Sequence, residues 1–402
     1  MERLHIAFFG PTNSGKSTLV NALAGQQVSL VSPIPGTTTD PVRKPIELPG
    51  LGPCVLIDTA GLGDVSALGA ERERMTRAIL DETDIAVVLD APELSSMSPK
   101  DGHWQQNMGE NAVNVPDFGT LATLAGIPVI RYTRGESVES LLERLIAAAP
   151  REEQKYLTGS LVHAGSSVLL VMPQDSEAPK GRLILPQVQV LRELLDRGCV
   201  PHCCTPESLP AALASLAGLP DLVITDSQVF GLVDRALPKE CPLTSFSVLL
   251  AAAKGDVRTF VAGARAINTL KPGSRVLIAE ACTHVPDTED IGRVKIPALL
   301  RKKMADQVGH AGDGAMPDGV MPEGVMPGLT GHLLQIDIAA GNDFPEDLSP
   351  YSLIVHCGAC VANARLVRSR IRKALLAGVP ITTYGIALAE LNGILGRIAI
   401  PD

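Results

Sequence analysis

The stretch GPTNSGKST, residues 10–18, decides the fold expected for the N-terminal part of the chain. It follows the apolar run LHIAFF and precedes LVNALAG, so a strand, a glycine-rich loop and a helix come in the order of a phosphate-binding loop. In such a loop the glycines turn backbone N–H groups toward phosphate oxygens, the lysine reaches the β- and γ-phosphates, and the serine ligates Mg²⁺. The nucleotide-binding residues expected from this stretch are Gly10, Asn13, Ser14, Gly15, Lys16, Ser17 and Thr18.

Two further motifs, PGTTTD and DTAG, indicate a nucleotide-dependent switch. DTAG follows the apolar run CVLI, so Asp58 stands where a carboxylate near Mg²⁺ is needed, and the N–H of Gly61 can meet a γ-phosphate. Thr37 or Thr38 is the expected threonine that closes on Mg²⁺ only when the γ-phosphate is present. We expect Lys16, Thr38, Asp58 and Gly61 to carry hydrolysis.

The three motifs in this order resemble the Era and MnmE branch of small GTPases. Guanine specificity in that branch comes from an Asn-Lys-x-Asp segment, and the nearest match here is NVPD, from Asn114 to Asp117. Val115 and Pro116 replace the usual middle, so the segment is either a degenerate guanine reader or an ordinary loop. GTP as the nucleotide is therefore inferred from the other motifs.

Two residues bear on the rate of hydrolysis. Leu62 follows DTAG where Ras-type enzymes place a water-orienting glutamine, which predicts slow intrinsic hydrolysis. Asn13 matches the loop asparagine that coordinates potassium in the MnmE branch. The resemblance thus implies K⁺ stimulation, which we treat as a hypothesis.

Composition sets the class of protein. With 402 residues, 20 % charged and 45 % hydrophobic, the chain is expected to be globular with two to four domains. A net charge of −9 without a lysine-rich tail argues against a nucleic-acid partner. The apolar runs are too short to span a membrane, and the first residues lack a secretory signal, so we expect a cytoplasmic protein with no membrane association. Its eight cysteines are then expected to be thiols or metal ligands.

Strand-like and helix-like stretches alternate in three sections, which predicts an α/β fold with a P-loop GTPase domain followed by two smaller α/β domains. The expected domains are residues 1–160, residues 161–265 and residues 266–402. The last contains a Met-Pro-x-Gly-Val repeat, and we expect a flexible loop over about residues 305–331.

Cysteine and histidine follow two strands of the last section. Cys282 and His284 come after VLIAEA, while His356, Cys357 and Cys360 come with YSLIVH. Because the carboxyl ends of parallel strands meet at one edge of a sheet, these residues are expected to converge. A helix expected directly after Cys360 would lower the pKa of the thiols. Three thiolates leave one position of a 4Fe–4S cluster for His284, His356 or an outside group, whereas zinc in a Cys₃His site accepts the same residues.

The remaining cysteines have a simpler explanation. Cys199 and the run HCC at residues 202–204 are expected at the edge of a strand, where free cysteine packs as a small hydrophobe. Cys54 and Cys241 are also expected to be packing residues.

A GTPase domain with Cys-x-His and His-Cys-x-x-Cys far downstream resembles the FeFe-hydrogenase maturation GTPase family HydF. The resemblance rests on PTNSGKST, PGTTTDPV and DTAGL in the first section and on EACTH, DIGRVKIP and HCGAC in the last. It implies a GTPase domain, a dimerisation domain and a domain that binds a 4Fe–4S cluster through Cys282, Cys357 and Cys360. It also implies a homodimeric scaffold or carrier, which receives a transient di-iron precursor from radical-SAM maturases and delivers it to apo-FeFe-hydrogenase.

Three alternatives stay open at this point. The chain could be a regulatory or assembly GTPase that bears zinc, or a diverged paralogue with a different client. A scaffold with a dead nucleotide site is the third, and the intact Lys16, Ser17, Asp58 and Gly61 argue against it.

Overall fold

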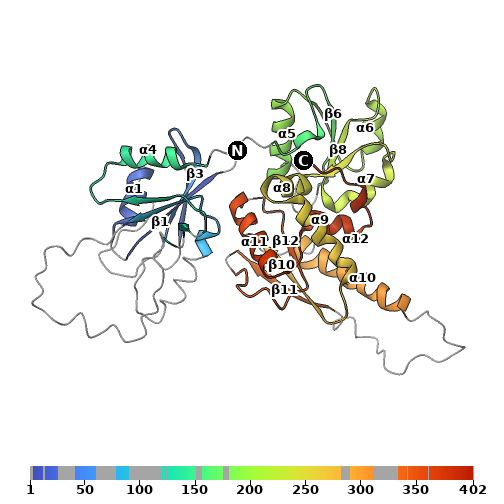
Figure 1. Cartoon of the computed structure of the whole chain (residues 1–402). Coiled ribbons are helices and arrows are strands. Elements are labelled where there is room, and N and C mark those ends of the chain that lie inside the picture. Colours follow the sequence, from blue (N-terminus) through green and yellow to red (C-terminus); the bar gives the residue numbers. More distant parts are fainter. Residues whose placement is uncertain are drawn as a thin grey trace, which may run out of the picture. The chain divides into compact units, whose positions relative to one another are not determined.

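A computed structural model gives the fold in two compact units, Met1–Glu152 and Glu153–Asp402, which are considered separately (Figure 1). The structure describes residues 3–11, 14–25, 41–59, 78–89, 120, 122–123, 125–150, 156–174, 181–281, 290–311, 334–341, 343–360 and 362–401.

The first unit is built on a five-stranded sheet with the order β2-β3-β1-β4-β5. All neighbouring strands are parallel except β2 and β3, which form an antiparallel pair at one edge. The bounds of these strands are β1 Leu4–Phe9, β2 Val42–Leu48, β3 Gly52–Asp58, β4 Ile85–Leu89 and β5 Val129–Tyr132. The near-continuous burial of β1 and β4 explains their uninterrupted apolar sequences, because central strands of a parallel sheet are covered on both faces.

Two helices of the first unit, α1 (Lys16–Ala24) and α4 (Val138–Ala148), share one hydrophobic cluster with the sheet. Ser137 caps the start of helix α4, and its side chain accepts a hydrogen bond from the Ser140 N–H. Leu141 and Leu145, one turn apart on α4, are fully buried in this cluster. The amphipathic pattern of the sequence thus corresponds to the observed packing.

The second unit contains two four-stranded sheets in which all neighbouring strands are parallel. The first sheet has the order β7-β6-β8-β9, with β6 Ser167–Val171, β7 Val200–Cys204, β8 Leu222–Thr225 and β9 Leu243–Ser245. The second has the order β11-β10-β12-β13, with β10 Ser274–Glu280, β11 Leu334–Ala340, β12 Leu353–His356 and β13 Ile381–Thr383. The helices of this unit are α5 Leu185–Asp196, α6 Leu209–Ser215, α7 Phe230–Ala236, α8 Phe246–Lys254, α9 Val257–Arg265, α10 Ile296–Ala311, α11 Ala364–Leu376 and α12 Tyr384–Leu391.

The two sheets of the second unit repeat one topology. In chain order, the second strand, the first, the third and the fourth lie side by side in both. The last strand and helix of each repeat also match in sequence, PLTSFSVLLAAAKG at residues 242–255 and PITTYGIALAELNG at residues 380–393. In this match Lys254, which ends α8, corresponds to Asn392, which follows α12.

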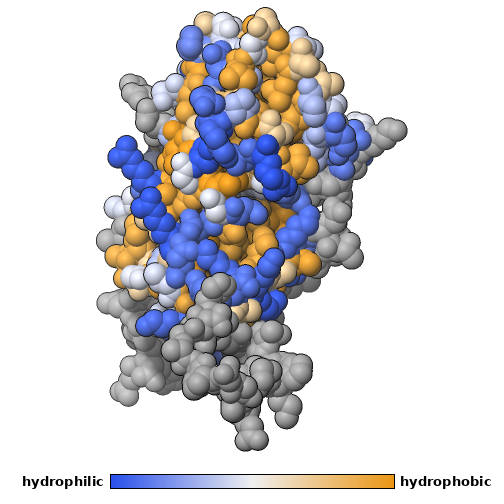
Figure 2. Space-filling model, turned by 90° about the vertical axis from the view of Figure 1, so that its right-hand side faces the viewer, coloured by the Kyte–Doolittle hydropathy of each residue, from blue (hydrophilic) through white to orange (hydrophobic). Residues whose placement is uncertain are grey.

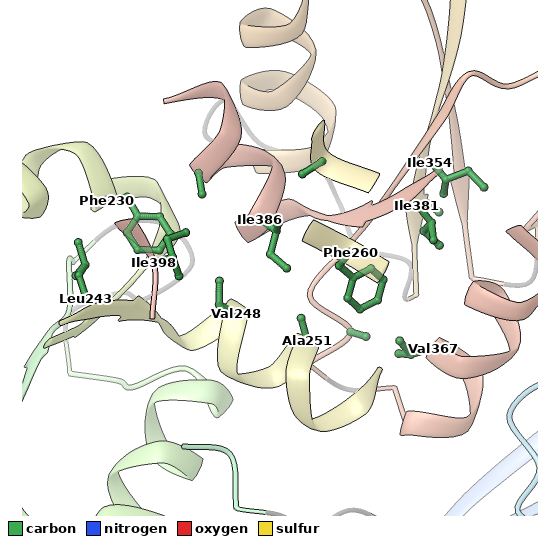
Figure 3. Close-up of a cluster of buried hydrophobic side chains, with 14 of the residues drawn as sticks. Phe230, Leu243, Val248, Ala251, Phe260, Ile354, Val367, Ile381, Ile386 and Ile398 are labelled. Carbon is green, nitrogen blue, oxygen red and sulfur yellow. The ribbon is translucent and has the colours of Figure 1, made fainter. Parts of the chain in front are cut away.

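The two repeats share one hydrophobic core (Figure 3). Val248 and Ala251 on α8 of the first repeat belong to the same cluster as Phe260 on α9 and Ile386 on α12. Near the end of the chain, Ile398 forms an isolated parallel bridge with a residue of β9. The second unit is therefore held together by side chains from both repeats.

The surface shown in Figure 2 carries apolar patches between polar side chains. Exposed apolar residues of the second unit include Leu185, Val188 and Leu195 on α5. Among the described residues, no helix has the length and the hydrophobicity that crossing a membrane requires.

The predicted α/β fold class is confirmed. The strand β2 was not expected from the sequence, because VRKPIEL alternates polar with apolar residues and contains a proline that suits only an edge strand. Helix α10 extends to Ala311, so the first residues of the loop expected at about 305–331 are helical, and residues 312–333 lie outside the described part. The domain boundaries expected at residues 160 and 265 stay predictions.

Candidate functional site

The phosphate-binding loop of the first unit contains a buried lysine. The Lys16 Nζ donates hydrogen bonds to the carbonyl oxygens of Gly10 at 3.0 Å and Pro11 at 2.8 Å. Burial lowers the pKa of Lys16 to about 8, and the nearby Asp58 carboxylate partly opposes this shift. The ammonium is thus held by the loop's own carbonyl groups.

Asp58 lies at the carboxyl end of β3 and pairs in register with Phe8 of the neighbouring β1. Its side chain is fully buried, and among the described residues neither carboxylate oxygen has a hydrogen-bond partner. A buried carboxylate without partners is strongly unfavourable unless a cation compensates it. The position therefore fits Mg²⁺, held directly or through its water ligands.

Glycine is required at two positions of the loop. A Cβ on Gly10 would lie 2.7 Å from the carbonyl oxygen of Leu89, which is closer than van der Waals contact allows. Gly15 precedes α1 with a φ of 97°, a conformation that side-chain-bearing residues rarely adopt. Ser17 and Thr18 lie in the first turn of α1, and Ser14 has a buried Oγ with no partner in the described part.

Several expected residues of the nucleotide site lie outside the part that the structure describes. They are Asn13, Thr37, Thr38, Gly61, Leu62, Asn114 and Asp117. Their roles stay predictions.

The carboxyl ends of β10 and β12 meet in the second unit, as expected for adjacent parallel strands. The Cys357 N–H donates to the carbonyl oxygen of Ala279 at 2.8 Å. The Ala281 N–H in turn donates to the Cys357 Sγ at 3.1 Å. This pair of contacts puts the Cys357 sulfur against the residue that precedes Cys282.

Cys282 and His284 themselves lie outside the described residues. Within the described ranges, no three histidine, cysteine or acidic side chains lie close enough together to hold a metal ion. Cys357 and Cys360 are both half-buried. The helix expected directly after Cys360 begins only at Ala364, because the Asn363 side chain accepts a hydrogen bond from the Leu366 N–H and caps the helix there.

His356 is buried, and both of its ring nitrogens have protein partners. Its Nδ1 lies 2.7 Å from the carbonyl oxygen of Cys357, which can only accept, so this nitrogen carries the proton. The Nε2 then accepts from the Arg370 guanidinium at 3.0 Å. Burial and the charge of Arg370 lower the pKa of His356 to about 3. Both ring nitrogens thus have protein partners, and the role of His356 as a candidate fourth cluster ligand stays a prediction.

A charged network that the sequence analysis did not identify surrounds the end of β10. The buried Glu280 carboxylate forms a salt bridge with Arg293 at 2.7 Å and accepts a hydrogen bond from the Tyr384 hydroxyl at 3.4 Å. Arg370 donates to the backbone carbonyls of Glu280 and Gly341. Arg293 lies in a π-helical turn, Ile291–Lys295, within DIGRVKIP. The DIGRVKIP motif was the sequence signal for this network, because a half-buried arginine such as Arg293 needs an acidic partner.

The other cysteines form no site within the described chain. Cys54, Cys199 and Cys241 are buried, as expected for packing residues, and burial raises the pKa of each thiol. Cys203 and Cys204 follow each other on β7, so their side chains point to opposite faces of the sheet.

Family models match most of the chain. The hydrogen maturase F dimerization domain matches residues 157–255, and the hydrogen maturase F tetramerization domain matches residues 258–314 and 320–401. Together these two matches cover more than half of the chain. The chain belongs to the hydrogen maturase F family. A third model, described as a 50S ribosome-binding GTPase, matches residues 5–115, so the first unit of this family member is a P-loop GTPase domain.

Curated relatives resemble this hydrogen maturase F family member over a limited length. The tRNA modification GTPase MnmE of Methylobacterium sp. (strain 4-46) is 40 % identical over 157 residues, which are 37 % of this chain and 34 % of the relative. The mitochondrial 5-taurinomethyluridine tRNA synthase subunit GTPB3 of Homo sapiens is 45 % identical over 97 residues, or 24 % of this chain and 20 % of the relative. The chain spans about a third or less of the length of these relatives.

Solved structures match parts of the chain with low TM-scores. Era from Aquifex aeolicus bound to GDP·AlF4⁻ is 17 % identical, covers 54 % of this chain and 99 % of its own, and has a TM-score of 0.27. Toc33 from Arabidopsis thaliana in complex with GDP and Mg²⁺ is 27 % identical, covers 22 % of this chain and 36 % of its own, and has a TM-score of 0.19. Such low scores add nothing to the assignment, which rests on the sheets and the family models.

Proposed function

We propose that this chain binds and hydrolyses GTP and serves as a maturation factor for FeFe-hydrogenase. In this role it holds a 4Fe–4S cluster and carries a di-iron precursor to the apo-hydrogenase. The family assignment supports this role, and the 3.1 Å hydrogen bond from the Ala281 N–H to the Cys357 Sγ is the structural observation that carries it. That bond ties the segment entering Cys282 to the first cysteine of the downstream pair.

In the nucleotide site, Lys16 exchanges its bonds to the loop carbonyls for bonds to the β- and γ-phosphates. Ser17 and Asp58 would hold Mg²⁺, which supplies positive charge to the phosphates when bound. The buried and unpartnered carboxylate of Asp58 supports this role. Gly10 and Gly15 let the loop backbone approach the phosphates.

The remaining roles in this site are proposed from the motifs. Thr37 or Thr38 and Gly61 would respond to the γ-phosphate, and Asn114 and Asp117 would read the guanine base. Asn13 would coordinate K⁺ and so stimulate hydrolysis, which the leucine after DTAG keeps slow. The K⁺ role can be tested separately from the other proposed roles, by comparing the hydrolysis rates in KCl and in NaCl at equal ionic strength.

In the cysteine site, Cys282, Cys357 and Cys360 would hold the 4Fe–4S cluster as thiolates. An N–H donor to a ligating sulfur stabilises its negative charge, and the Ala281 N–H already points at the Cys357 Sγ. Since both nitrogens of His356 are engaged, the fourth position falls to His284 or to an outside group. An open or exchangeable position suits a carrier, because cargo can bind there and leave.

Oligomerisation is supported by two family matches, one named for dimerization and one for tetramerization. We propose a homodimer that can assemble further. Radical-SAM maturases and apo-FeFe-hydrogenase are the proposed partners.

A second candidate is a GTPase regulator that carries zinc. The same three thiolates and His284 would satisfy tetrahedral zinc. A diverged member of the family with another client would instead keep the cluster and fail to activate hydrogenase.

The first test is the iron, zinc and acid-labile sulfide content of anaerobically purified and reconstituted full-length protein, together with its EPR spectrum. The variant with Cys282, Cys357 and Cys360 all changed to Ala serves as the comparison, and Cys203→Ala, an exposed cysteine of β7, is the control. About four irons with sulfide per chain, lost in the triple variant and kept in the control, support the proposal. One zinc without sulfide overturns the iron assignment.

The client is tested separately. The cluster-loaded protein, supplied with the radical-SAM maturases, is mixed with apo-FeFe-hydrogenase, and hydrogen evolution is measured. Activation supports the maturation role, whereas a loaded protein that never activates hydrogenase indicates another client.

A further inference from the structure

The loop that carries Cys357 and Cys360 has a strained backbone. Ala359, between the two cysteines, has a φ of 50°, and no other non-glycine residue of the described part has a positive φ. For a residue with a Cβ, this left-handed conformation is less favourable than a right-handed one. Its carbonyl oxygen also accepts from the Ala362 N–H at 3.2 Å, which closes a tight turn around Cys360. A strained turn persists only where its surroundings impose it.

Lys254 supplies such a constraint. Its Nζ donates to the carbonyl oxygens of Ala359 and Ala362, both at 2.7 Å, and to that of Cys360 at 3.4 Å. An ammonium group has three protons, so three carbonyl acceptors from one turn match its donors. The lysine thus fixes the orientation of the carbonyl groups of Ala359, Cys360 and Ala362.

The hydrogen bonds from Lys254 to the cysteine loop, called the clamp here, join the two domains that the family models match. Lys254 is the last residue of α8 and lies within the dimerization-domain match, whereas the cysteine loop lies within the tetramerization-domain match. The contact spans 105 residues of sequence between Lys254 and Ala359. The geometry of the cysteine loop therefore depends on a helix of the other domain.

The repeat within the second unit shows that the clamp is not a requirement of the topology. Asn392 is the counterpart of Lys254, and its side chain donates to Leu388 of its own helix at 2.7 Å. The loop that follows β8 corresponds to the cysteine loop after β12, and it begins at Asp226 with a φ of −74° and reaches Val229 with a φ of −105°. Among the described residues of the two repeats, the left-handed residue and the lysine contacts occur together at the loop after β12.

We propose that Lys254 is a positioning residue that holds the Cys357–Cys360 loop in the conformation that presents both thiolates to the cluster. This inference rests on the proposed cluster function for its consequence, but the clamp itself consists of contacts between protein groups alone. Through Lys254, the dimerization domain controls how firmly the loop keeps its ligands in place. The positive charge beside Cys360 also favours the more negative, reduced form of a bound cluster.

The test compares full-length wild type, Lys254→Met and the control Asn392→Met, which makes a similar change at the counterpart position. In the metal-free proteins, hydrogen exchange is followed for the peptides that cover residues 357–363. We expect exchange of these amides to become at least about tenfold faster in Lys254→Met and to stay unchanged in the control. Equal exchange in wild type and Lys254→Met would overturn the clamp.

The reconstituted proteins give the second set of readouts: iron retained against a chelator, the EPR spectrum and the midpoint potential. Lys254→Met is expected to lose iron several-fold faster, to show an altered EPR spectrum and to have a more negative midpoint potential. Ala359→Gly, which removes the strain of the left-handed residue, should restore much of the iron retention when combined with Lys254→Met. A loaded Lys254→Met protein with unchanged retention, spectrum and potential contradicts the positioning role.

The outcomes separate this inference from the proposed function. If wild type binds no cluster but the metal-free loop loosens in Lys254→Met, the cluster function fails and the clamp stands. If wild type binds the cluster and Lys254→Met behaves identically in every readout, the positioning role fails alone. If Lys254→Met does not fold, as judged by its melting curve, Lys254→Arg keeps the charge and must retain slow exchange, or the clamp is rejected.

Discussion

Lys16 and Asp58 are both buried in the first unit, yet the lysine ammonium donates to the carbonyls of its own loop and not to the carboxylate. Because these two opposite charges are not hydrogen-bonded to each other, each can bind a group of opposite charge from a ligand. A phosphate satisfies the ammonium, and a divalent cation satisfies the carboxylate. The first three predictions concern this nucleotide site.

The affinity for MgGTP should depend on pH through Lys16. Because burial holds the pKa of the free protein's Lys16 at about 8, the ammonium needed by the phosphates is fully present below that pH and is lost above it. Affinity should be level from pH 6.5 to about 7.5 and then fall by up to about tenfold per pH unit above 8. Titrations with a fluorescent GTP analogue from pH 6.5 to 9.5 measure this. A flat profile to pH 9.5 contradicts the lowered pKa.

Asp58→Asn should have opposite effects on the free and the bound protein. The substitution removes a buried charge that accepts no hydrogen bond in the described part, so the nucleotide-free GTPase unit should become more stable by about 1 kcal/mol or more. Stabilisation by MgGTP should largely disappear, because the carboxylate near Mg²⁺ is lost. Melting temperatures with and without MgGTP test both parts. Lys44→Ala on the edge strand β2 is a control that should change neither.

Gly10→Ala should disable the loop. The new Cβ would lie 2.7 Å from the carbonyl oxygen of Leu89, so β4 or the loop must shift, at a cost of about 1–3 kcal/mol of unfolding free energy. Nucleotide binding should weaken at least about tenfold, because the backbone N–H groups lose their alignment. Denaturant unfolding and GTP titration provide the two measurements, and Gly25→Ala at the end of α1 tests for a general glycine effect.

His356→Gln should leave the cluster in place but weaken the fold. The glutamine oxygen can still accept from the buried Arg370, but the ring N–H that bonds the Cys357 carbonyl oxygen is lost, and losing such a hydrogen bond costs about 0.5–1.5 kcal/mol. Iron content and the EPR spectrum of the reconstituted protein should match those of wild type, while the unfolding free energy falls. His284→Ala, which removes the other candidate histidine ligand, is compared in the same measurements. A changed spectrum in His356→Gln alone would restore His356 as a ligand.

The sequence predicted elements wherever local pattern and packing agree. Residues 4–9 are apolar throughout and form a central strand, and residues 138–148 have apolar side chains one turn apart and form a helix behind a serine cap. The start of α11 was misplaced because Cys360 was given more weight than the capping signal of Asn363. Edge strand β2 was missed because its polar alternation resembles a loop when its partner is unknown.

The two candidate sites also differ in how far the sequence alone predicts them. The phosphate loop is contiguous, so its residues could be identified from one motif. The partners of the cysteine loop come from distant segments: Glu280 meets Arg293, and Lys254 meets Ala359, only after the sheets have formed. No local spacing encodes such contacts. The repeated topology was also hidden, because its two copies share mainly the class of residue and few identities.

The shared core of the second unit changes what can be removed from this protein. Only Gly255 and Asp256 separate α8 from α9, and Val248 and Phe260 on either side belong to one hydrophobic cluster. A truncation between the two matched domains would expose this interior to water, and the fragments would aggregate for reasons unrelated to partners or cargo. Chimeras between family members should therefore exchange residues 157–401 as a single block. A chimera would then gain or lose the proposed assembly and cargo-carrying functions together.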